Sequence, residues 1–415
     1  MKRIAVIGSG ISGLSAAYHL SRKHEVHVFE RDNRLGGHTH TVMVDSSSGQ
    51  IPVDTGFIVH NDRTYPNFCR LMDQLGVASQ PSDMSFAVTE LEGSFGYSSR
   101  GLRGFFAQKT NCFSPPHYKL LSEILRFNRE APKVLTDPDA EGMTLGEFLD
   151  QGGYAPIFVD RYLIPMAGAV WSMAPEVMPT FPVVTLVRFM QNHGMLGINT
   201  HPQWKVIRGG SHSYLAPLTA PFQKRIVKDA SITSIERSEL GVTLRFPDRP
   251  AQQFDEVVFA CHGDQILPML AQPTDEERKV LNCFTTTRNE TCLHTDSTLL
   301  PKRAAARASW NYLLGDSGKV TVTYHMNRLQ SLKTAEDYCV TLNANGAIDP
   351  KRVLRTMVYQ HPLYTRAAIR GQERWPEISG KNRTHFCGAY WFYGFHEDGV
   401  RSGMRVAEAL EVRCS

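Results

Sequence analysis

The chain has 415 residues, of which 42% are hydrophobic and 21% charged, an ordinary composition for a globular protein with large cores. This length is enough for two or three domains. The net charge of +4 is too small to indicate a nucleic-acid partner. The eight cysteines are scattered without a C-x-x-C pair or zinc-ligand spacing, which predicts reduced cytoplasmic thiols and no metal site.

The first thirty residues predict a βαβ unit. RIAVIG (3–8) is typical of a buried strand, ISGLSAAYHLSRK (11–23) of a helix, and EVHVFE (25–30) of a second strand. The basic start and apolar run are also features of a signal peptide, but two glycines interrupt the apolar run. No apolar run reaches the roughly 18 residues that a membrane span requires.

A G-x-G-x-x-G motif lies at the predicted strand-to-helix turn. Gly8 permits the tight turn, Gly10 lets a diphosphate approach the backbone, and Gly13 lets the helix pack on the strand. The helix N-terminus, including Ser12, offers N–H groups to the phosphates. Glu30, twenty residues after Gly10, is placed to bind ribose hydroxyls. The motif predicts a dinucleotide site, with NAD and FAD both as candidates.

The next segment favours FAD. ERDNRLGGH (30–38) contains E-x-x-x-R-x-G-G, formed by Glu30, Arg34, Gly36 and Gly37. It resembles the FAD signature of the flavin amine oxidase superfamily, which includes protoporphyrinogen oxidase and phytoene desaturase relatives. The resemblance implies that Arg31, Arg34 and the glycine pair border the FAD diphosphate and flavin. His38 replaces an arginine that is usual in the superfamily.

Four later segments continue the resemblance in chain order. Asp54 and Gly56, in VDTGF, match the strand-turn after the glycine pair, which makes Thr55 and Gly56 candidate cofactor contacts, and the Gly-Gly of 204–218 matches a helix returning to the FAD domain. In 225–246, predicted as two strands, the resemblance implies that Ile232 contacts the adenine. The predicted strand at 255–263 matches a strand of this superfamily, and the resemblance implies that Ala260, near its end, lies beside the cofactor.

The stretch FCGAYWFYGFHEDGVRSGMRVAEAL (386–410) resembles the element that closes the FAD site in this superfamily. The implied cofactor contacts are Gly388, Asp398, Gly399 and Val400. A helix N-terminus pointed at the flavin stabilises negative charge on its reduced form. Trp391 and Tyr393 are candidates to wall the flavin or substrate, with core packing as the alternative. His396 is the candidate acid–base group, with a purely structural histidine as the alternative.

These segments predict an α/β protein with a discontinuous, Rossmann-like FAD domain of the flavin amine oxidase and glutathione reductase type (1–60, 204–265 and 381–415). The remaining residues, 61–203 and 266–380, predict an α+β substrate domain, with helices at 64–75, 117–130 and 182–194. The Met- and Phe-rich segment 162–197 suits a long apolar ligand or an ordinary core. Segment 96–113 mixes arginines with a Phe pair, as a membrane-surface patch or an ordinary loop does.

A narrower resemblance, carried by LHTD, SWNY, TYHMNRLQ and GAYWFYGFHEDG, is to bacterial FAD-binding, amine-oxidase-like proteins associated with cyclopropane fatty-acid synthases. It implies an FAD-dependent oxidoreductase that takes hydride from an apolar substrate and desaturates a fatty acyl chain, including a methyl-branched one. One alternative is a flavin amine oxidase producing imine and peroxide. Another is a flavin-bearing, lipid-binding partner of a fatty-acyl methyltransferase. The implied location is cytoplasmic, with peripheral contact to the inner face of the membrane.

Overall fold

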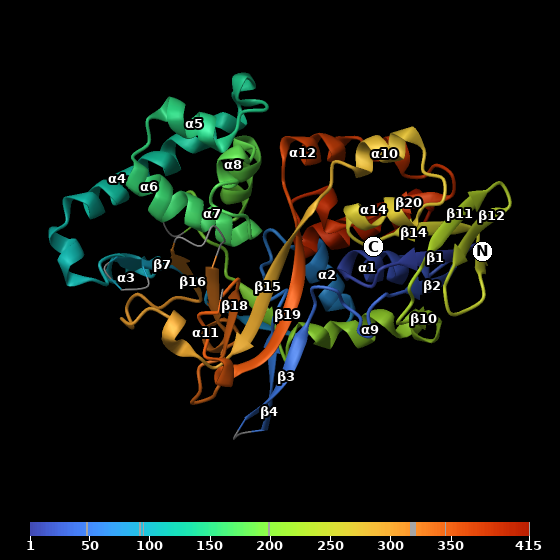
Figure 1. Ribbon diagram of the computed structural model, residues 1–415, viewed down its shortest axis with the longest axis horizontal. Coiled ribbons are helices and arrows are strands. Elements are labelled where there is room, and N and C mark those ends of the chain that lie inside the picture. Colours follow the sequence, from blue (N-terminus) through green and yellow to red (C-terminus); the bar gives the residue numbers. More distant parts are fainter. Residues whose placement is uncertain are drawn as a thin grey trace.

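The computed structural model describes residues 1–46, 49–90, 93, 95–197, 200–315, 321–344 and 346–414. In Figure 1 both ends of the chain lie on the side of a small parallel sheet, and a lobe of helices lies at the opposite end of the molecule. A larger sheet, with long strands β15 and β19, lies between these two parts.

Five parallel strands form the first sheet, in the order β10–β2–β1–β14–β20. Their bounds are β1 (Arg3–Ile7), β2 (Glu25–Phe29), β10 (Ile226–Val227), β14 (Glu256–Phe259) and β20 (Thr384–Phe386). Segments from the beginning, middle and end of the chain therefore pair side by side. Strands β1 and β14 are almost continuously apolar, as expected for parallel strands that are covered on both faces.

Alternate residues of β1 pack into two different cores. Ile4 and Val6 pack with helices α1 (Ile11–Leu20) and α14 (His396–Ala409). Ala5 and Ile7 pack on the other face, against a small antiparallel sheet and three short helices. These covering elements are β11 (Ser234–Ser238), β12 (Gly241–Arg245), β13 (Gln252–Phe254), α10 (Asp275–Leu281), α12 (Arg366–Glu373) and α13 (Trp375–Ile378).

The larger sheet has seven strands in the order β19–β15–β18–β17–β16–β7–β8. Their bounds are β7 (Phe86–Glu90), β8 (Gly96–Ser98), β15 (Thr286–His294), β16 (Trp310–Leu314), β17 (Thr321–His325), β18 (Cys339–Leu342) and β19 (Val353–Pro362). All neighbours are antiparallel except the pair β7 and β16. The pairing of β7 with β16 brings residues 86–90 next to residues more than two hundred positions later.

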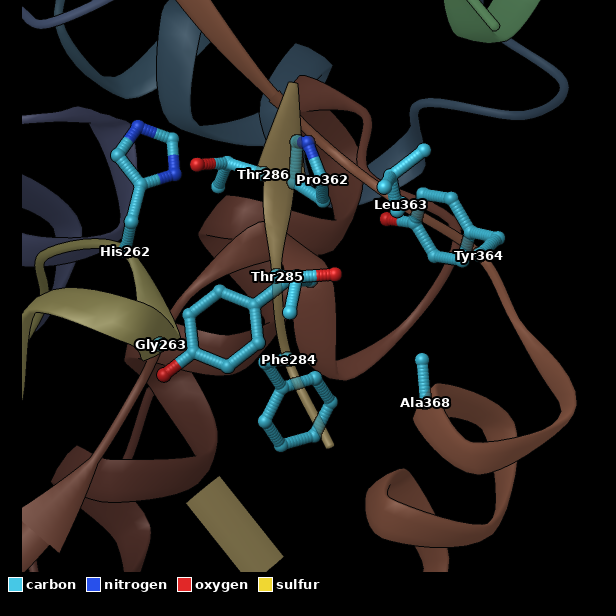
Figure 2. A pocket seen from close by; sticks show the side chains of 10 residues that line it. His262, Gly263, Phe284, Thr285, Thr286, Pro362, Leu363, Tyr364 and Ala368 are labelled. Carbon is cyan, nitrogen blue, oxygen red and sulfur yellow. The ribbon is translucent and has the colours of Figure 1, made fainter. Parts of the chain in front are cut away.

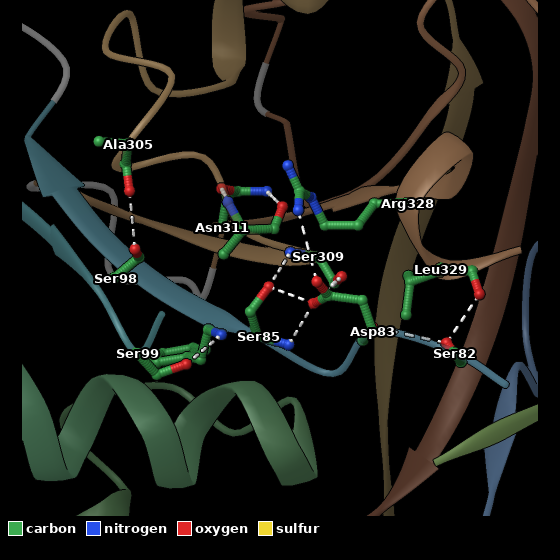
Figure 3. Close-up of polar contacts among 12 residues, drawn as sticks. Ser82, Asp83, Ser85, Ser98, Ser99, Ala305, Ser309, Asn311, Arg328 and Leu329 are labelled. Carbon is green, nitrogen blue, oxygen red and sulfur yellow. Dashed lines mark hydrogen bonds and ion pairs between the residues drawn. The ribbon is translucent and has the colours of Figure 1, made fainter. Parts of the chain in front are cut away.

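Asp83 holds the point where the chain enters this sheet (Figure 3). Its carboxylate accepts hydrogen bonds from the N–H of Ser85 at 2.8 Å and the hydroxyl of Ser309 at 2.9 Å, and Arg328 Nη1 lies 3.4 Å away. The Ser85 hydroxyl also donates to Asp83. Partial burial opposes ionisation, but these hydrogen bonds hold the pKa of Asp83 below its usual value. The network fixes the start of β7 against β16.

The helical lobe lies beyond this sheet (Figure 1). It contains α3 (Gly101–Phe105), α4 (Pro115–Glu130), α5 (Leu145–Gly152), α6 (Pro156–Phe158), α7 (Ile164–Trp171) and α8 (Val183–Asn192). Its core is continuous with apolar residues of the larger sheet. Shorter elements complete the fold: β3 (Thr41–Ser46), β4 (Gly49–Asp54), β5 (Val59–His60), α2 (Pro66–Gln74), β6 (Ser79–Pro81), β9 (Lys205–Ile207), α9 (Leu215–Thr219) and α11 (Met326–Leu329).

The predicted α/β fold class is confirmed, and the predicted local elements are present. The helices expected at 64–75, 117–130 and 182–194 are α2, α4 and α8. The region 225–246 differs from the prediction, because it forms three strands instead of two. Ile226 and Val227 pair with β2 as strand β10, and the hairpin of β11 and β12 follows separately.

The division into an FAD domain and a substrate domain stays a proposal, with one change. The strands of the parallel sheet come from 1–60, 204–265 and 381–415, and those of the larger sheet come from the two remaining segments. Residues of 266–284 and 366–378, however, pack onto the parallel sheet. We therefore propose that both belong with the FAD domain.

Candidate cofactor and active site

The glycine turn lies where β1 ends and α1 begins, at the carboxyl edge of the parallel sheet. Gly8 has a φ of +105°, and a Cβ there would lie 3.0 Å from the carbonyl group of Ala260. A Cβ on Gly13 would lie 2.1 Å from the carbonyl oxygen of Gly8. A Cβ on Gly10 would meet no other heavy atom within 4 Å. The turn is therefore tight at Gly8 and Gly13 and open at Gly10, as the approach of a diphosphate requires.

Helix α1 begins at this opening. Its N-cap is Gly10, which has no side chain to accept hydrogen bonds from the first-turn N–H groups, and its first turn has no acidic residue. Ser12, in that turn, is buried. The positive end of α1 is thus left for an anion rather than neutralised by the protein.

Glu30 both faces the predicted ribose position and holds the glycine turn. Its carboxylate accepts hydrogen bonds from the N–H of Ser9 at 2.9 Å, the Ser9 hydroxyl at 2.5 Å and the N–H of Asp32 at 3.0 Å. The role in fixing the turn was not predicted from the sequence. Loss of Glu30 would therefore disturb the turn as well as remove an acceptor.

The second glycine pair packs directly on the first turn. Gly36 donates its N–H to the Ser9 carbonyl at 3.0 Å, and a Cβ on Gly37 would lie 3.2 Å from the Cα of Gly10. Arg34 donates from Nη1 to the Gly37 carbonyl at 2.8 Å. The structure thus brings Arg34 and both glycines to the turn. The side chain of Arg31 is 68% exposed and lies 3.8 Å from Asp32.

Tyr359, on β19, joins the segment after the glycine pair to the larger sheet. Its hydroxyl lies 2.8 Å from His40 Nδ1 and 2.7 Å from Thr55 Oγ1. Gly56 passes so close to the turn after the second glycine pair that a Cβ there would lie 2.2 Å from the His38 carbonyl oxygen. The predicted residues Thr55 and Gly56 therefore connect the parallel sheet to β19.

Three histidines gather at this junction, from three separate segments of the chain. The ring of His38 lies 5.3 Å from that of His361 and 6.0 Å from that of His262, and Tyr359 is 5.1 Å away. Burial, with repulsion between neighbouring cationic forms, lowers the pKa of His38 and His361, that of His361 to about 4. Burial also lowers the pKa of His262. All three histidines are therefore neutral near pH 7, so they offer ring nitrogens for hydrogen bonding without adding charge to the junction.

A small pocket borders this cluster (Figure 2). His262 lies on one side of it near Thr286, and Leu363 and Tyr364 lie on the other. Within the described residues, His38 Nε2 and the hydroxyls of Tyr364 and Tyr390 are buried without a hydrogen-bond partner. Buried polar atoms of this kind are satisfied when a ligand or water reaches them.

The C-terminal element returns to the glycine turn, as predicted. Gly388 donates its N–H to the Ser402 hydroxyl at 3.0 Å. A Cβ on Gly399 would lie 2.5 Å from Ile11 Cγ2, so α14 crosses α1 near the start of both helices. Val400 is fully buried between them. Glycine at position 399 is therefore required for this close crossing.

Asp398 has an internal partner at the start of α14. Its carboxylate accepts a hydrogen bond from the N–H of Phe395 at 2.9 Å, and burial raises its pKa to about 7. The neighbouring Glu397 accepts hydrogen bonds from the N–H groups of Asn67 and Phe68, at the start of α2. Both acids fix the approach to α14.

Ile232, predicted at the adenine, and Ala260, predicted beside the cofactor, both lie next to the parallel sheet. Ala260 donates its N–H to the Ile7 carbonyl at 2.8 Å and packs against Gly8. Ile232 follows the turn in which the N–H of Ala230 bonds to the Glu30 carbonyl at 2.8 Å. This is the end of the sheet where the predicted ribose contact lies.

The three catalytic candidates occupy different environments. Trp391 is 1% exposed and packs against Phe284 with ring centroids 4.6 Å apart. His396 stacks on Phe57 at 3.5 Å, and its Nε2 lies 3.0 Å from Thr39 Oγ1; burial lowers its pKa to about 3. Tyr393 is half-buried. The surroundings of Trp391 and His396 suit packing and positioning roles, and Tyr393 has the most accessible side chain of the three.

The helical lobe meets the FAD side at Phe395. This ring stacks on Phe189 of α8 at 5.0 Å and lies 6.4 Å from Trp171 at the end of α7. Around them the lobe buries four methionines and further aromatic rings: Met166, Met173, Met178, Met190, Phe158 and Phe181. The Met- and Phe-rich segment singled out in the sequence therefore forms an apolar core that reaches the start of α14.

Sequence reasoning did not assign His262, Tyr359 or His361 to this site. His262 follows Ala260 by two residues, within the ACHG that ends a predicted strand. Tyr359 and His361 are separated by one residue on β19, so the period of two places both on one face. That alternation predicts that Tyr359 and His361 share a face of the strand, but the sequence does not reveal which sheet that face meets.

The described residues fit FAD. The open space at Gly10, the uncapped start of α1, the acid at the end of β2 and the unpartnered His38 Nε2 all lie at one edge of the sheet. The chain matches the model of the family described as flavin containing amine oxidoreductase over residues 11–410. The match leaves out only short segments at the two ends.

One curated relative and two solved structures are similar to the chain. A protein of Mycobacterium tuberculosis named "Putative flavin-containing monoamine oxidase AofH" is 26% identical over 252 residues, 58% of this chain and 53% of that protein. The chain spans about half or less of the length of the curated relatives it matches. Cyclohexylamine oxidase from Brevibacterium oxydans has a TM-score of 0.71 at 15% identity, covering 99% of both chains. A CLA-producing fatty acid isomerase from P. acnes has a TM-score of 0.67 at 15% identity, covering 97% of both chains. At this identity the likeness establishes the fold alone.

Proposed function

We propose that this chain, which belongs to the flavin-containing amine oxidoreductase family and takes FAD as its cofactor, desaturates a fatty acyl chain. The observation that carries this proposal is the apolar contact at Phe395, where the Met- and aromatic-rich core of the helical lobe meets the start of α14. A long apolar substrate requires such a wall, because its binding derives mainly from buried apolar area.

Residues at the carboxyl edge of the parallel sheet would hold the cofactor. Gly8, Gly10 and Gly13 with the start of α1 would take the diphosphate, and Glu30 the ribose. Gly36, Gly37, Arg34 and His38 would border the diphosphate and flavin, with Ser12, Arg31, Thr55 and Gly56 beside them. Ile232 and Ala260 would lie toward the adenine, and Gly388, Asp398, Gly399 and Val400 at the flavin end. Bound FAD supplies the acceptor for a hydride.

The protein's own residues contribute positioning and water exclusion. The stack of His396 on Phe57 and its contact with Thr39 fix the first turn of α14, and Glu397 fixes that turn to α2. Phe395 is held between this turn and the lobe. We propose that Phe395 and Tyr393 shape the substrate end of the site, and that Trp391 and His396 act as positioning residues.

The acids around the start of α14 favour a neutral chain over an ammonium group. Asp398 bonds to the N–H of Phe395, Glu397 bonds to α2, and Asp54 accepts hydrogen bonds from Ser211 and Thr41. Burial raises the pKa of Asp54 to about 6, as it raises that of Asp398. Because these carboxyl groups already accept hydrogen bonds from the protein, and burial favours the neutral form of Asp54 and Asp398, a cationic substrate would have to share or displace those bonds.

The alternative is a flavin amine oxidase, which the family and the name of the mycobacterial relative favour. The fatty acid isomerase of the same fold supports the lipid proposal, since the architecture of that protein serves a fatty acid. A third candidate is a lipid-binding flavoprotein that assists a fatty-acyl methyltransferase without oxidising its lipid. The three candidates differ in the compound that would reduce the flavin, which is an acyl chain for the desaturase, an amine for the amine oxidase, and neither for the lipid-binding partner.

The test is a fatty-acid profile by mass spectrometry of cells that express this chain with a cyclopropane-synthase-type methyltransferase. We expect a species two hydrogens lighter than the methylated acyl chain, because desaturation removes a hydride and a proton. The Gly10→Val variant, expected to lack FAD, is the matched control. A profile unchanged by the wild-type, FAD-loaded protein would refute desaturation of this substrate, and amine-dependent peroxide would favour the amine oxidase.

A further inference from the structure

An exposed apolar surface with unpaired cations lies on the helical lobe, outside the site described above. We define it as the α3–α4 tip, formed by residues 100–113 and by residues 115–125 of α4. Phe113 is 89% exposed, Leu102 72% and Tyr118 50%. Large apolar side chains exposed to this degree in one place mark an interaction surface more often than single ones do.

The apolar residues of the tip form one connected surface. The Phe106 ring lies 5.6 Å from the Tyr118 ring, and the Tyr118 hydroxyl donates to the Cys112 carbonyl at 3.0 Å, next to Phe113. Leu102 is one helical turn before Phe106, whose N–H bonds to its carbonyl at 2.9 Å. Leu125, 47% exposed, lies two turns beyond Tyr118 on α4.

The charge of the tip is positive and uncompensated. In the described part of the chain, Arg100, Arg103 and Lys109 have no ion pair, and all three are exposed. The acids of α4 are already paired on their own helix: Glu123 lies 2.6 Å from Lys119, and Glu130 lies 3.0 Å from Arg126. Along the chain, Arg100 and Arg103 lie on either side of exposed Leu102, and Lys109 lies four residues before exposed Phe113; among the described residues none of the three cations pairs with an acid.

We propose that the α3–α4 tip docks on the surface of an anionic phospholipid bilayer. Apolar side chains at the centre would enter the headgroup region, and the unpaired cations would contact lipid phosphates. The charge complementarity selects an anionic bilayer rather than a neutral one. No helix in the described ranges is long and apolar enough to cross a membrane, so the contact is peripheral.

The place of the tip in the fold is consistent with this partner. In Figure 1, α3 and α4 lie at the end of the molecule opposite the parallel sheet, on the lobe whose interior reaches Phe395. Docking there leaves the parallel sheet and both chain ends away from the bilayer. The proposal concerns binding and holds whatever the acyl substrate is.

The test is co-sedimentation of the purified, FAD-loaded protein with vesicles. One set contains phosphatidylcholine alone, and the other an equimolar mixture with phosphatidylglycerol. We expect binding to the anionic set, weakened by salt, and little binding to the neutral set. These vesicles lack methyl-branched chains and require no turnover, so the result is independent of the desaturase test.

Matched variants localise the contact. Phe113→Ser should weaken partitioning by about tenfold, because its ring leaves water on docking. Leu240→Ser, at a residue 98% exposed on the β11–β12 turn, is the control and should change nothing. Arg103→Gln should weaken binding about fivefold, the effect of one cation near the surface. Lys224→Gln, at an exposed lysine outside the tip, is its control.

Three results would overturn the proposal. One is equal binding to neutral and anionic vesicles. Another is equal vesicle binding by the wild type, Phe113→Ser and Arg103→Gln. The third is a dimer, seen by analytical ultracentrifugation, that Phe113→Ser dissociates while vesicle binding is absent. That result would make the tip an interface between two copies of the chain.

Discussion

Replacement of Gly10 by valine should abolish FAD binding and leave the fold intact. Gly10 has φ −66° and ψ 174°, an extended conformation that valine adopts readily. A Cβ there would meet no other heavy atom within 4 Å, so the protein itself has room for the β-carbon of the new side chain. The added methyl groups would instead fill the space that the diphosphate needs.

The expected magnitude follows from the hydrogen bonds that the diphosphate would lose. Each hydrogen bond to a charged group contributes roughly 1.5–3 kcal/mol, so loss of two N–H contacts weakens FAD binding by about 3–6 kcal/mol. That is about a 10²- to 10⁴-fold increase in Kd. The free energy of unfolding of the flavin-free protein should fall by no more than about 1 kcal/mol, because valine is a poorer N-cap of α1 than glycine but meets no steric conflict at its Cβ.

The assay is calorimetric titration of flavin-free protein with FAD, accompanied by thermal unfolding of the same samples. Gly13→Ala is the contrasting variant, since its Cβ would lie 2.1 Å from the carbonyl oxygen of Gly8. It should lower the Tm of the flavin-free protein more than Gly10→Val does. Wild-type FAD affinity in Gly10→Val would refute the placement of the diphosphate, and an unchanged Tm in Gly13→Ala would refute the packing of the turn.

Three further predictions concern single carboxyl groups. Glu30→Ala should weaken FAD binding by about 1–3 kcal/mol, measured by the same titration, and unchanged affinity would contradict the ribose assignment. Because burial raises the pKa of Asp398 from 3.8 to about 7, the flavin-free wild type should lose stability relative to Asp398→Asn as pH rises through that window. The loss should be on the order of 4 kcal/mol in urea unfolding, and parallel pH profiles would exclude the shift. Asp83→Ala should lower the free energy of unfolding by about 1–3 kcal/mol, because it removes the network in Figure 3. Asp62→Ala, which removes only the exposed pair of Asp62 with Lys205, is the control and should lower it by less than about 1 kcal/mol. Equal losses of stability in the two variants would contradict the network.

Local pattern was sufficient to predict the cofactor side of the molecule. The βαβ unit, the glycine turn and the acid at the end of β2 are close in sequence, and each has a geometric requirement that few residue types meet. Gly8 and Gly13 show this, since the structure leaves no space for a side chain at either position. The closing helix was also predictable, because Gly399 and Gly403 are both needed where α14 crosses α1.

The junction between the two sheets was not predictable from local pattern. Tyr359 and His361 lie on β19, more than three hundred residues after the His38 ring that they contact. Their roles depend on which strand β19 joins and on which of its faces meets the parallel sheet. The same reason applies to His396: the sequence left it open between an acid–base group and a structural histidine, and the fold stacks it on Phe57 in a buried position.

The proposed desaturation requires that an acyl chain, and not an amine, reduce the bound flavin. The most direct measurement is anaerobic bleaching of the flavin absorbance when the purified protein is mixed with phospholipid carrying methyl-branched acyl chains. A panel of primary amines is tested in parallel. The account predicts bleaching by the lipid alone. Bleaching by amines with none by the lipid would contradict it and identify an amine oxidase.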